Sequence, residues 1–197
     1  MYDEEVTPRA MGTTLRGKAG KRPERVRAGI EQLIGSWHHN PASVHNQFLE
    51  VLAANPLAIA LSPSFTPGVN RLRAMFLDPA VRDLHRDWEV ASAQAVGWVR
   101  ALAGSRVESP ELVRLVGQIS VKSVEFRRLW AQREVQPRLS GTGRLDHPEV
   151  GPLDLRYENL ALDGRTGQQL VVFHADPGSA SADGLALLGA LSAGDRS

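Results

Sequence analysis

Histidine is the residue type in this sequence best suited to acid–base or metal chemistry, and the histidines are scattered. They stand at positions 38, 39, 45, 85, 147 and 174, and the chain has no cysteine. No two of them form a His-Glu-x-x-His or His-x-His pair, so their spacing indicates no metal site. His38 and His39 are adjacent, and adjacent side chains on a helix point apart. We therefore expect neither a metal nor a cofactor.

Two histidines stand where they could transfer a proton. His174 lies in an apolar stretch two residues before Asp176, and His147 precedes Pro148 where a strand is expected. However, the sequence has no Gly-x-Ser-x-Gly, no P-loop and no dinucleotide-binding glycine motif. A histidine before a turn also commonly hydrogen-bonds the backbone. We expect no catalytic residue and no enzyme. An enzyme enclosing an apolar substrate, with His174 and Asp176 as acid and base, is the alternative.

The clearest strand lies at residues 152–162, where apolar and charged side chains alternate. That period belongs to a strand with one dry face and one wet face. Residues 48–54 and 168–176 also read as strands. We expect one dry wall built from Leu153, Leu155, Tyr157, Val172, His174, Val51 and Ala53.

Apolar residues at helical spacing predict the elements that must cover this wall. Asp78-Pro79 is an N-cap followed by a first-turn proline, and the stripe behind it predicts one helix of about 25 residues, ending at Gly104. Further helices are expected from Pro23 to Trp37, after Asn55-Pro56, after Ser109-Pro110, after Ser123 and around residues 185–191. The run Gly141-Thr142-Gly143 reads as a turn.

The expected order is a helix, two strands, several helices, three strands and a helix. This order predicts an α+β fold, in which a PAS-like antiparallel sheet is covered on one face by several helices and flanked by N- and C-terminal helices. We expect a tail or linker over 1–22, one domain over 23–192 and a short tail over 193–197.

The charge distribution also favours a tail followed by a globular body. Net charge is +1, yet residues 9–27 hold seven basic side chains and one acid. We interpret residues 1–22 as a disordered basic linker. There is no apolar run of 18 residues, and the first 12 residues do not resemble a signal peptide. We expect a cytoplasmic protein that does not enter a membrane.

Six runs resemble the ligand-binding domain of MmyB-like transcription regulators, a family of bacterial XRE-type regulators. They occur in the family's order and cover about residues 22–190. The runs are RPERVRAGIEQLI (22–34), FLEVLAANPLAIAL (48–61), MFLDPAVRDLHRDWE (75–89), FRRLWAQREV (126–135), DHPEVGPLDL (146–155) and QQLVVFHADPGSAS (168–181). Ala54 replaces the family's usual tryptophan before Asn55, and Trp98 stands where a smaller residue is common.

The resemblance implies a PAS-like sensor of a small apolar molecule, with a fatty acid as the best candidate. It also places DNA binding in a separate N-terminal helix-turn-helix. Because about 22 residues precede the first run, we expect no direct DNA binding from this chain. We expect it to act alone, or as a homodimer or a heterodimer with a full-length regulator.

A fatty acid needs a dry tunnel with one polar end, and each buried methylene contributes about 0.8 kcal/mol. The dry sheet wall forms one side of the expected tunnel. The other side is expected from Phe76, Leu84, Trp88, Phe126 and Trp130, and His147 or His174 is expected to meet the carboxylate. A filled core in a plain interaction module is the alternative, because sequence does not distinguish a core from a lined cavity.

Overall fold

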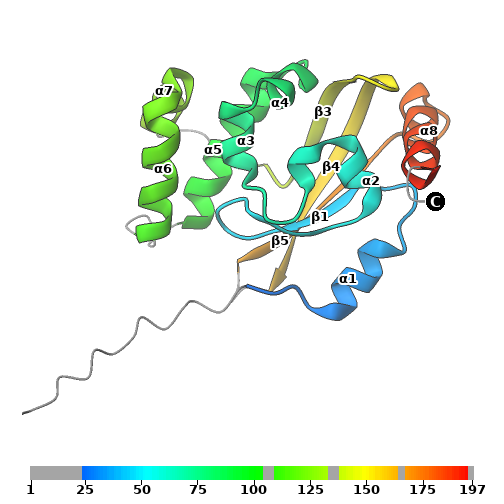
Figure 1. The fold of residues 1–197 in the computed structure, drawn as a ribbon, viewed down its shortest axis with the longest axis horizontal. Coiled ribbons are helices and arrows are strands. Elements are labelled where there is room, and N and C mark those ends of the chain that lie inside the picture. The colour runs from blue at the N-terminus through cyan, green and yellow to red at the C-terminus, as the bar shows by residue number, and fades with distance from the viewer. Residues whose placement is uncertain (1–23, 104–108, 133–137, 164–166, 195–197) are drawn as a thin grey trace, which may run out of the picture.

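The protein is built around one antiparallel sheet of five strands (Figure 1). The structure, a computed structural model, describes residues 24–103, 109–132, 138–163 and 167–194. The strands lie in the order β2-β1-β5-β4-β3. Their bounds are Ala42–His45 (β1), Val51–Ala54 (β2), Ser140–His147 (β3), Gly151–Asp163 (β4) and Gln168–His174 (β5). The predicted α+β fold with a PAS-like sheet is confirmed.

Most of the helices lie between β2 and β3 in the chain. The helices are α1 (Ala28–Gly35), α2 (Pro56–Leu61), the 3-10 turn η1 (Pro63–Phe65), α3 (Arg71–Leu77), α4 (Pro79–Leu84), α5 (Trp88–Ala103), α6 (Pro110–Lys122), α7 (Val124–Ala131) and α8 (Ala180–Gly194). The predicted tail over 1–22 lies outside the described residues, as do residues 195–197. Helix α8 runs two residues beyond the expected domain end at 192.

Strand register divides the sheet into two faces. On β5, Val171 and Phe173 alternate with Leu170 and Val172, so they point to opposite faces. The face with Leu170 also carries Val44 and is packed against α1, the first helix. The face with Phe173 carries Leu153 and Leu155, which pack against α2 and α8. Thus α1 lies against one face of the sheet, and α2 and α8 lie against the other.

Asn55 joins the start of α2 to the segment that connects α1 with β1. Its Oδ1 accepts hydrogen bonds from the amides of Ala42 (3.0 Å) and Ala58 (2.9 Å). Its Nδ2 donates to three carbonyls, those of Ile34, Trp37 and Asn40. Because the side chain is buried, these bonds satisfy polar atoms that water does not reach. The predicted cap at Asn55-Pro56 is confirmed.

The predicted 25-residue helix is wrong, because residues 85–87 leave helical geometry between α4 and α5. His85 pairs with Leu145 in an antiparallel bridge, and the Arg86 amide donates to the Arg144 carbonyl at 3.0 Å. This segment therefore extends the sheet beside its edge strand β3. In the sequence, the helical spacing of apolar residues continues through 85–87 without a break. The hydrogen bonds that this segment makes with the free edge of β3 outweigh that helical tendency.

Three other sequence expectations also need correction. The glycines at 141 and 143 lie inside β3 rather than in a turn, and the β3–β4 turn falls at residues 148–150. A Cβ at Gly141 would lie 2.6 Å from the Tyr157 hydroxyl, so glycine makes room for that ring. Helix α1 begins at Ala28 rather than at Pro23. Helix α3 was missed, although Asn70 caps it by accepting from the Arg73 amide.

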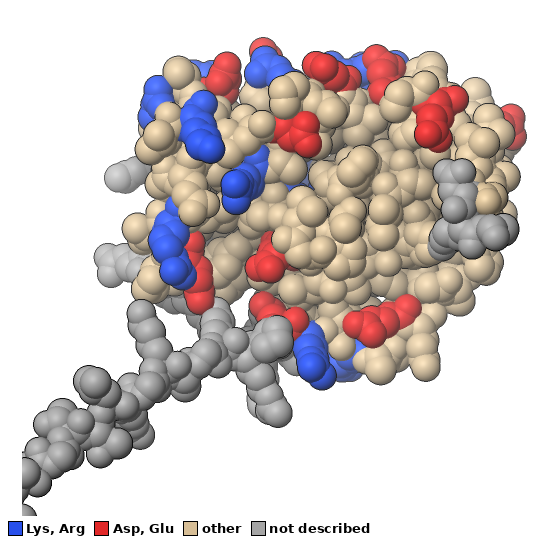
Figure 2. Space-filling view, in the orientation of Figure 1, with Lys and Arg blue, Asp and Glu red and all other residues tan. Residues whose placement is uncertain are grey.

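Charged side chains on the described surface are of mixed sign. Figure 2 shows basic and acidic residues interspersed around a largely uncharged surface over α2 and α8, with several basic residues on the side of α6 and α7. No helix in the described ranges is both long and apolar enough to span a bilayer.

Candidate ligand-binding site

A cavity of about 160 Å³ lies between the sheet and helices α3, α4 and α5. Its sheet side is lined by side chains that point to the face away from α1, including His45, Leu145, Tyr157, Val171 and Phe173. Its helix side includes Phe65, Arg71, Met75, Leu84, His85, Asp87 and Trp98. Most of these side chains are aliphatic or aromatic, as is usual for small-molecule sites.

Four rings run along one side of the cavity. Phe65 lies between His45 (ring centroids 6.2 Å apart, stacked) and Phe173 (5.6 Å, edge to face). Tyr157 continues the row, 6.2 Å from Phe173. Burial raises the pKa of Tyr157, which keeps its hydroxyl neutral. The row offers an apolar surface with one hydroxyl.

Two arginines line this cavity: Arg138, just before β3, is exposed, whereas Arg71 on α3 is half-buried. Its guanidinium carbon lies 4.0 Å from the centre of the Phe65 ring. Within the described residues, no carboxylate pairs with it, and its buried Nε has no hydrogen-bond partner. Burial lowers the pKa of Arg71 to about 10, so the side chain remains charged at neutral pH. Arg71 as a whole is half-buried, so its charge has lost part of its hydration without gaining a counter-ion, which points to a partner supplied by a ligand.

Two histidines beside Arg71 are neutral at neutral pH. Burial, with a smaller contribution from the charge of Arg71, holds the pKa of His45 well below 6.5. His45 is fully buried, its Nε2 lies 2.9 Å from the Ser43 hydroxyl, and its Nδ1 has no partner. Burial also lowers the pKa of His85, outweighing its hydrogen bond to the Val81 carbonyl. The positive charge at this end of the cavity is therefore that of Arg71.

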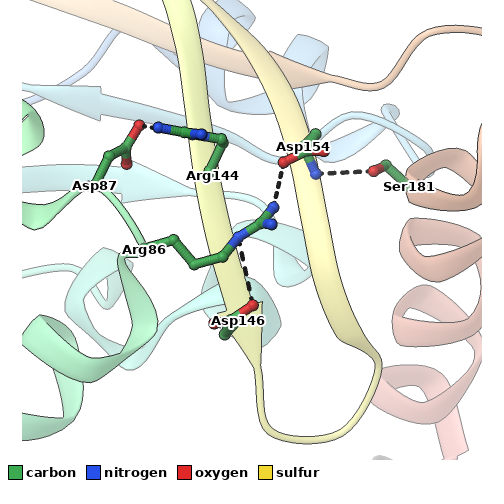
Figure 3. Close-up of polar contacts among 6 residues, drawn as sticks. All are labelled: Arg86, Asp87, Arg144, Asp146, Asp154 and Ser181. Atoms are coloured by element: carbon green, nitrogen blue, oxygen red, sulfur yellow. Dashed lines mark hydrogen bonds and ion pairs between the residues drawn. The ribbon is translucent and has the colours of Figure 1, made fainter.

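Asp87 lines the cavity and also pairs with Arg144 on the edge strand β3 (Figure 3). Its Oδ2 accepts from Arg144 Nε at 3.4 Å, and its buried Oδ1 has no partner. The preceding residue, Arg86, points outward and pairs with Asp146 (3.4 Å) and with Asp154. The Asp154 amide in turn donates to Ser181 at the start of α8. The cavity wall at 85–87 is thus fastened to two strands.

Leu84 and Tyr157 are the two predicted site residues that line the cavity. Leu155 shares the sheet face of Tyr157 but packs in the core, as does Leu153, which meets α8 at Gly184. Val51 is also buried without lining the cavity, and Ala53 lies on the α1 side with Val44.

The expectation that Val172 and His174 share the dry face of Leu155 is wrong. Val172 pairs with Glu158 and His174 with Arg156, so both belong to the opposite face. Their neighbours Val171 and Phe173 line the cavity instead. The run QQLVVFH is apolar on both faces because α1 covers part of the outer face. Alternation therefore does not reveal which residues face inward.

The four large aromatic residues expected on the helix side form a solid core. Trp88, Phe76, Phe126 and Trp130 follow one another in ring contact, with centroids 5.6, 5.0 and 5.6 Å apart. Trp88 Nε1 also donates to the Met75 carbonyl at 3.0 Å. These four residues do not line the cavity, and Trp98 is the tryptophan that does.

The two polar side chains expected to meet a carboxylate have other neighbours. His147 Nε2 lies 3.0 Å from the Ala60 carbonyl, and its Nδ1 accepts from the Glu149 amide at 3.2 Å. It therefore stabilises the β3–β4 turn. His174 lies on the outer face, and Asp176 near it pairs with Arg156 at 2.8 Å. Neither His174 nor Asp176 lines the cavity, so the enzyme alternative loses its acid–base pair.

The sequence analysis missed Arg71, His85 and Asp87. No sequence pattern separates Arg71 from the exposed Arg73 two positions later, because both lie in an unassigned stretch. The cap at Asn70 was the available signal for α3, and a helix there would have placed Arg71 beside Leu72 and Met75. In the described part of the chain, no group of three or more His, Asp or Glu side chains is arranged to hold a metal ion.

A PAS-like sheet with a lined cavity under its helices is an arrangement suited to binding a small molecule. The sequence model of the MmyB-like transcription regulator ligand binding domain matches residues 26–188, and the chain belongs to this family. The comparison with curated proteins gives no match. The chain therefore contains a ligand-binding domain of the transcription-regulator type.

Proposed function

We propose that this domain senses a carboxylic acid of the fatty-acid class, as the regulatory part of an XRE-type transcription regulator in the cytoplasm. The observation that carries the proposal is Arg71, a charged and unpaired side chain in a largely apolar cavity. An ionised carboxylate would supply the missing counter-ion, and such charge-assisted bonds are about twice as strong as neutral ones. The hydrocarbon chain would lie along Phe65, Phe173 and Tyr157.

The size of the cavity favours a short or medium chain. At about 160 Å³ it is close to the apolar cavity of roughly 150 Å³ that holds one benzene molecule. A longer chain would require Trp98 or its neighbours to move. Trp98 therefore acts in this proposal as the residue that limits chain length.

Sensing requires that the ligand prefer one of two arrangements of the domain. The segment 85–87 is suited to this because it lines the cavity with His85 and Asp87 and reaches the outer face with Arg86. A ligand that moves this segment would change the ion pairs on β3 and β4. The arrangement of charges on the outer face would then differ between the ligand-bound and the ligand-free domain.

Mass spectrometry of an organic extract of the purified chain tests the proposal. We expect a stoichiometric carboxylic acid from the wild-type chain and a much smaller amount from Arg71→Leu. Arg73→Leu is the matched control, because Arg73 is exposed on the same helix. If the wild-type and Arg71→Leu chains carry equal amounts of the same acid, the role of Arg71 is refuted. A stoichiometric ligand without an acidic group would refute the ligand class.

A further inference from the structure

Three buried side-chain polar atoms in the described residues have no hydrogen-bond partner, and all belong to residues that line the cavity. They are His45 Nδ1, Arg71 Nε and Asp87 Oδ1. Buried polar atoms are nearly always paired in folded proteins, and leaving one unpaired costs about 1–3 kcal/mol. Their clustering around one cavity points to an occupant that supplies the missing partners. Because all three atoms are out of reach of water in the empty domain, the lining side chains must shift to receive it.

These atoms require partners of different kinds. Arg71 Nε carries a hydrogen and needs an acceptor, whereas Asp87 Oδ1 needs a donor when the carboxylate is ionised. Asp87 is also held by Arg144 through its other oxygen, so its carboxylate cannot turn away freely. An ionised fatty acid offers two acceptor oxygens and no donor. It would satisfy Arg71 and leave Asp87 facing a hydrocarbon chain.

His85 adds a second acceptor beside Asp87. Its Nδ1 lies 2.7 Å from the Val81 carbonyl oxygen. A carbonyl only accepts hydrogen bonds, so the hydrogen of the neutral ring is on Nδ1 and Nε2 is an acceptor. Within the described residues, nothing donates to this Nε2. Because His85 and Asp87 both line the cavity, the 85–87 wall brings two acceptors to its border, opposite in character to Arg71.

We propose that the ligand carries a hydrogen-bond donor on its chain in addition to its carboxylate, so that a hydroxylated fatty acid is preferred to the plain acid. The carboxylate lies at Arg71, and the hydroxyl donates to Asp87 Oδ1 with His85 Nε2 nearby. This inference rests on the proposed function, because it assumes that an acid occupies the cavity. It adds a specificity-determining role for Asp87.

Calorimetric titration of the full chain with octanoic acid, 2-hydroxyoctanoic acid and 3-hydroxyoctanoic acid tests the inference. We expect one of the two hydroxy acids to bind wild-type protein about tenfold more tightly than octanoic acid, as a bond to a charged group would give. Asp87→Ala should abolish this preference. Arg156→Ala is the matched control, since it breaks an exposed ion pair with Asp176, neither residue lines the cavity, and the preference should be retained.

The possible outcomes separate this inference from the function on which it rests. If wild-type protein binds all three acids equally, the ligand hydroxyl does not meet Asp87 and the inference is overturned, while the proposed function stands. A preference that survives in Asp87→Ala also overturns it. If no acid binds to wild-type protein at millimolar concentration, both the inference and the proposed function fail. The comparison of acids on wild-type protein does not depend on how well any variant folds.

Discussion

The guanidinium of Arg71, a half-buried side chain, lies 4.0 Å above the ring of Phe65 and has no acidic partner among the described residues. Attraction to the ring face offsets part of the cost of burying the charge, by about 0.5–2 kcal/mol. The remainder of that cost lowers the stability of the empty domain. The presence of Arg71 at this position is thus better explained by a role in ligand binding than by a contribution to the stability of the fold.

Replacing Arg71 should therefore stabilise the empty domain. One pKa unit corresponds to about 1.4 kcal/mol, and the lowered pKa of Arg71 places the expected gain from Arg71→Leu at about 1–3 kcal/mol. The gain in stability is at the lower end of this range if the part of the Arg71 guanidinium that faces the cavity stays hydrated in the empty domain. Urea unfolding of ligand-free protein measures the change, and Arg73→Leu should shift stability by less than about 0.5 kcal/mol. A loss of stability in Arg71→Leu would contradict this account.

Stability should fall when the pH drops below about 6.5. Burial holds the pKa of His45 in the folded domain below that of the unfolded chain. Between those two values the unfolded chain binds the extra proton, so acid favours unfolding. From pH 7 to pH 5, His45 should account for a loss of about 1–2 kcal/mol. Chemical unfolding at several pH values measures this, and the slope should be shallower in His45→Gln. An unchanged slope would show that His45 is protonated within the fold.

Trp98→Leu should shift the chain-length preference towards longer acids. The side chain is 9% exposed and lines the cavity, so shortening it opens space for further methylenes at about 0.8 kcal/mol each. Stability should fall by less than the roughly 3–5 kcal/mol of a buried Trp→Ala change. Calorimetric titration with octanoic and dodecanoic acids gives the ratio of affinities.

Trp130→Leu is the control for this experiment, because Trp130 stacks on Phe126 in the solid core. It should lower stability without changing the ratio of the two affinities. If both variants change the ratio equally, the effect comes from general loosening rather than from the cavity wall.

Arg86 should contribute more to stability than Arg156 does. Arg86 is 34% exposed at its side chain and pairs with two carboxylates, whereas Arg156 is 59% exposed and pairs with Asp176 alone. We expect Arg86→Ala to lower the free energy of unfolding by about 0.5–1 kcal/mol and Arg156→Ala to lower it by less. Unfolding in low and high salt checks both values. Equal losses would mean that the 85–87 segment is held by its backbone bonds alone.

Sequence patterns predicted the fold better than the site. Helix caps at Asn55, Asp78, Ser109 and Ser123 and the alternation at Leu153–Glu158 all correspond to observed elements. The break at His85 was not predictable from periodicity, because it results from pairing with β3, which is about 60 residues away in the chain. Local patterns do not contain such a long-range contact.

The cavity was harder to predict for a physical reason. Phe76, Trp88 and Trp98 are all large and apolar, yet the first two fill the core and the third borders a space. Whether a ring faces a neighbour or a cavity depends on how helices from distant parts of the chain pack. Likewise, Arg71 and Arg73 differ only in which side of α3 they occupy.

The most direct test of the central claim is calorimetric titration of octanoic acid and its methyl ester into wild-type and Arg71→Leu protein at neutral pH. The account predicts that Arg71→Leu binds the acid at least about tenfold more weakly, the loss expected for one bond to a charged group, while binding of the neutral ester changes little. If Arg71→Leu binds the acid as tightly as wild-type protein does, the carboxylate does not meet Arg71 and the account is contradicted.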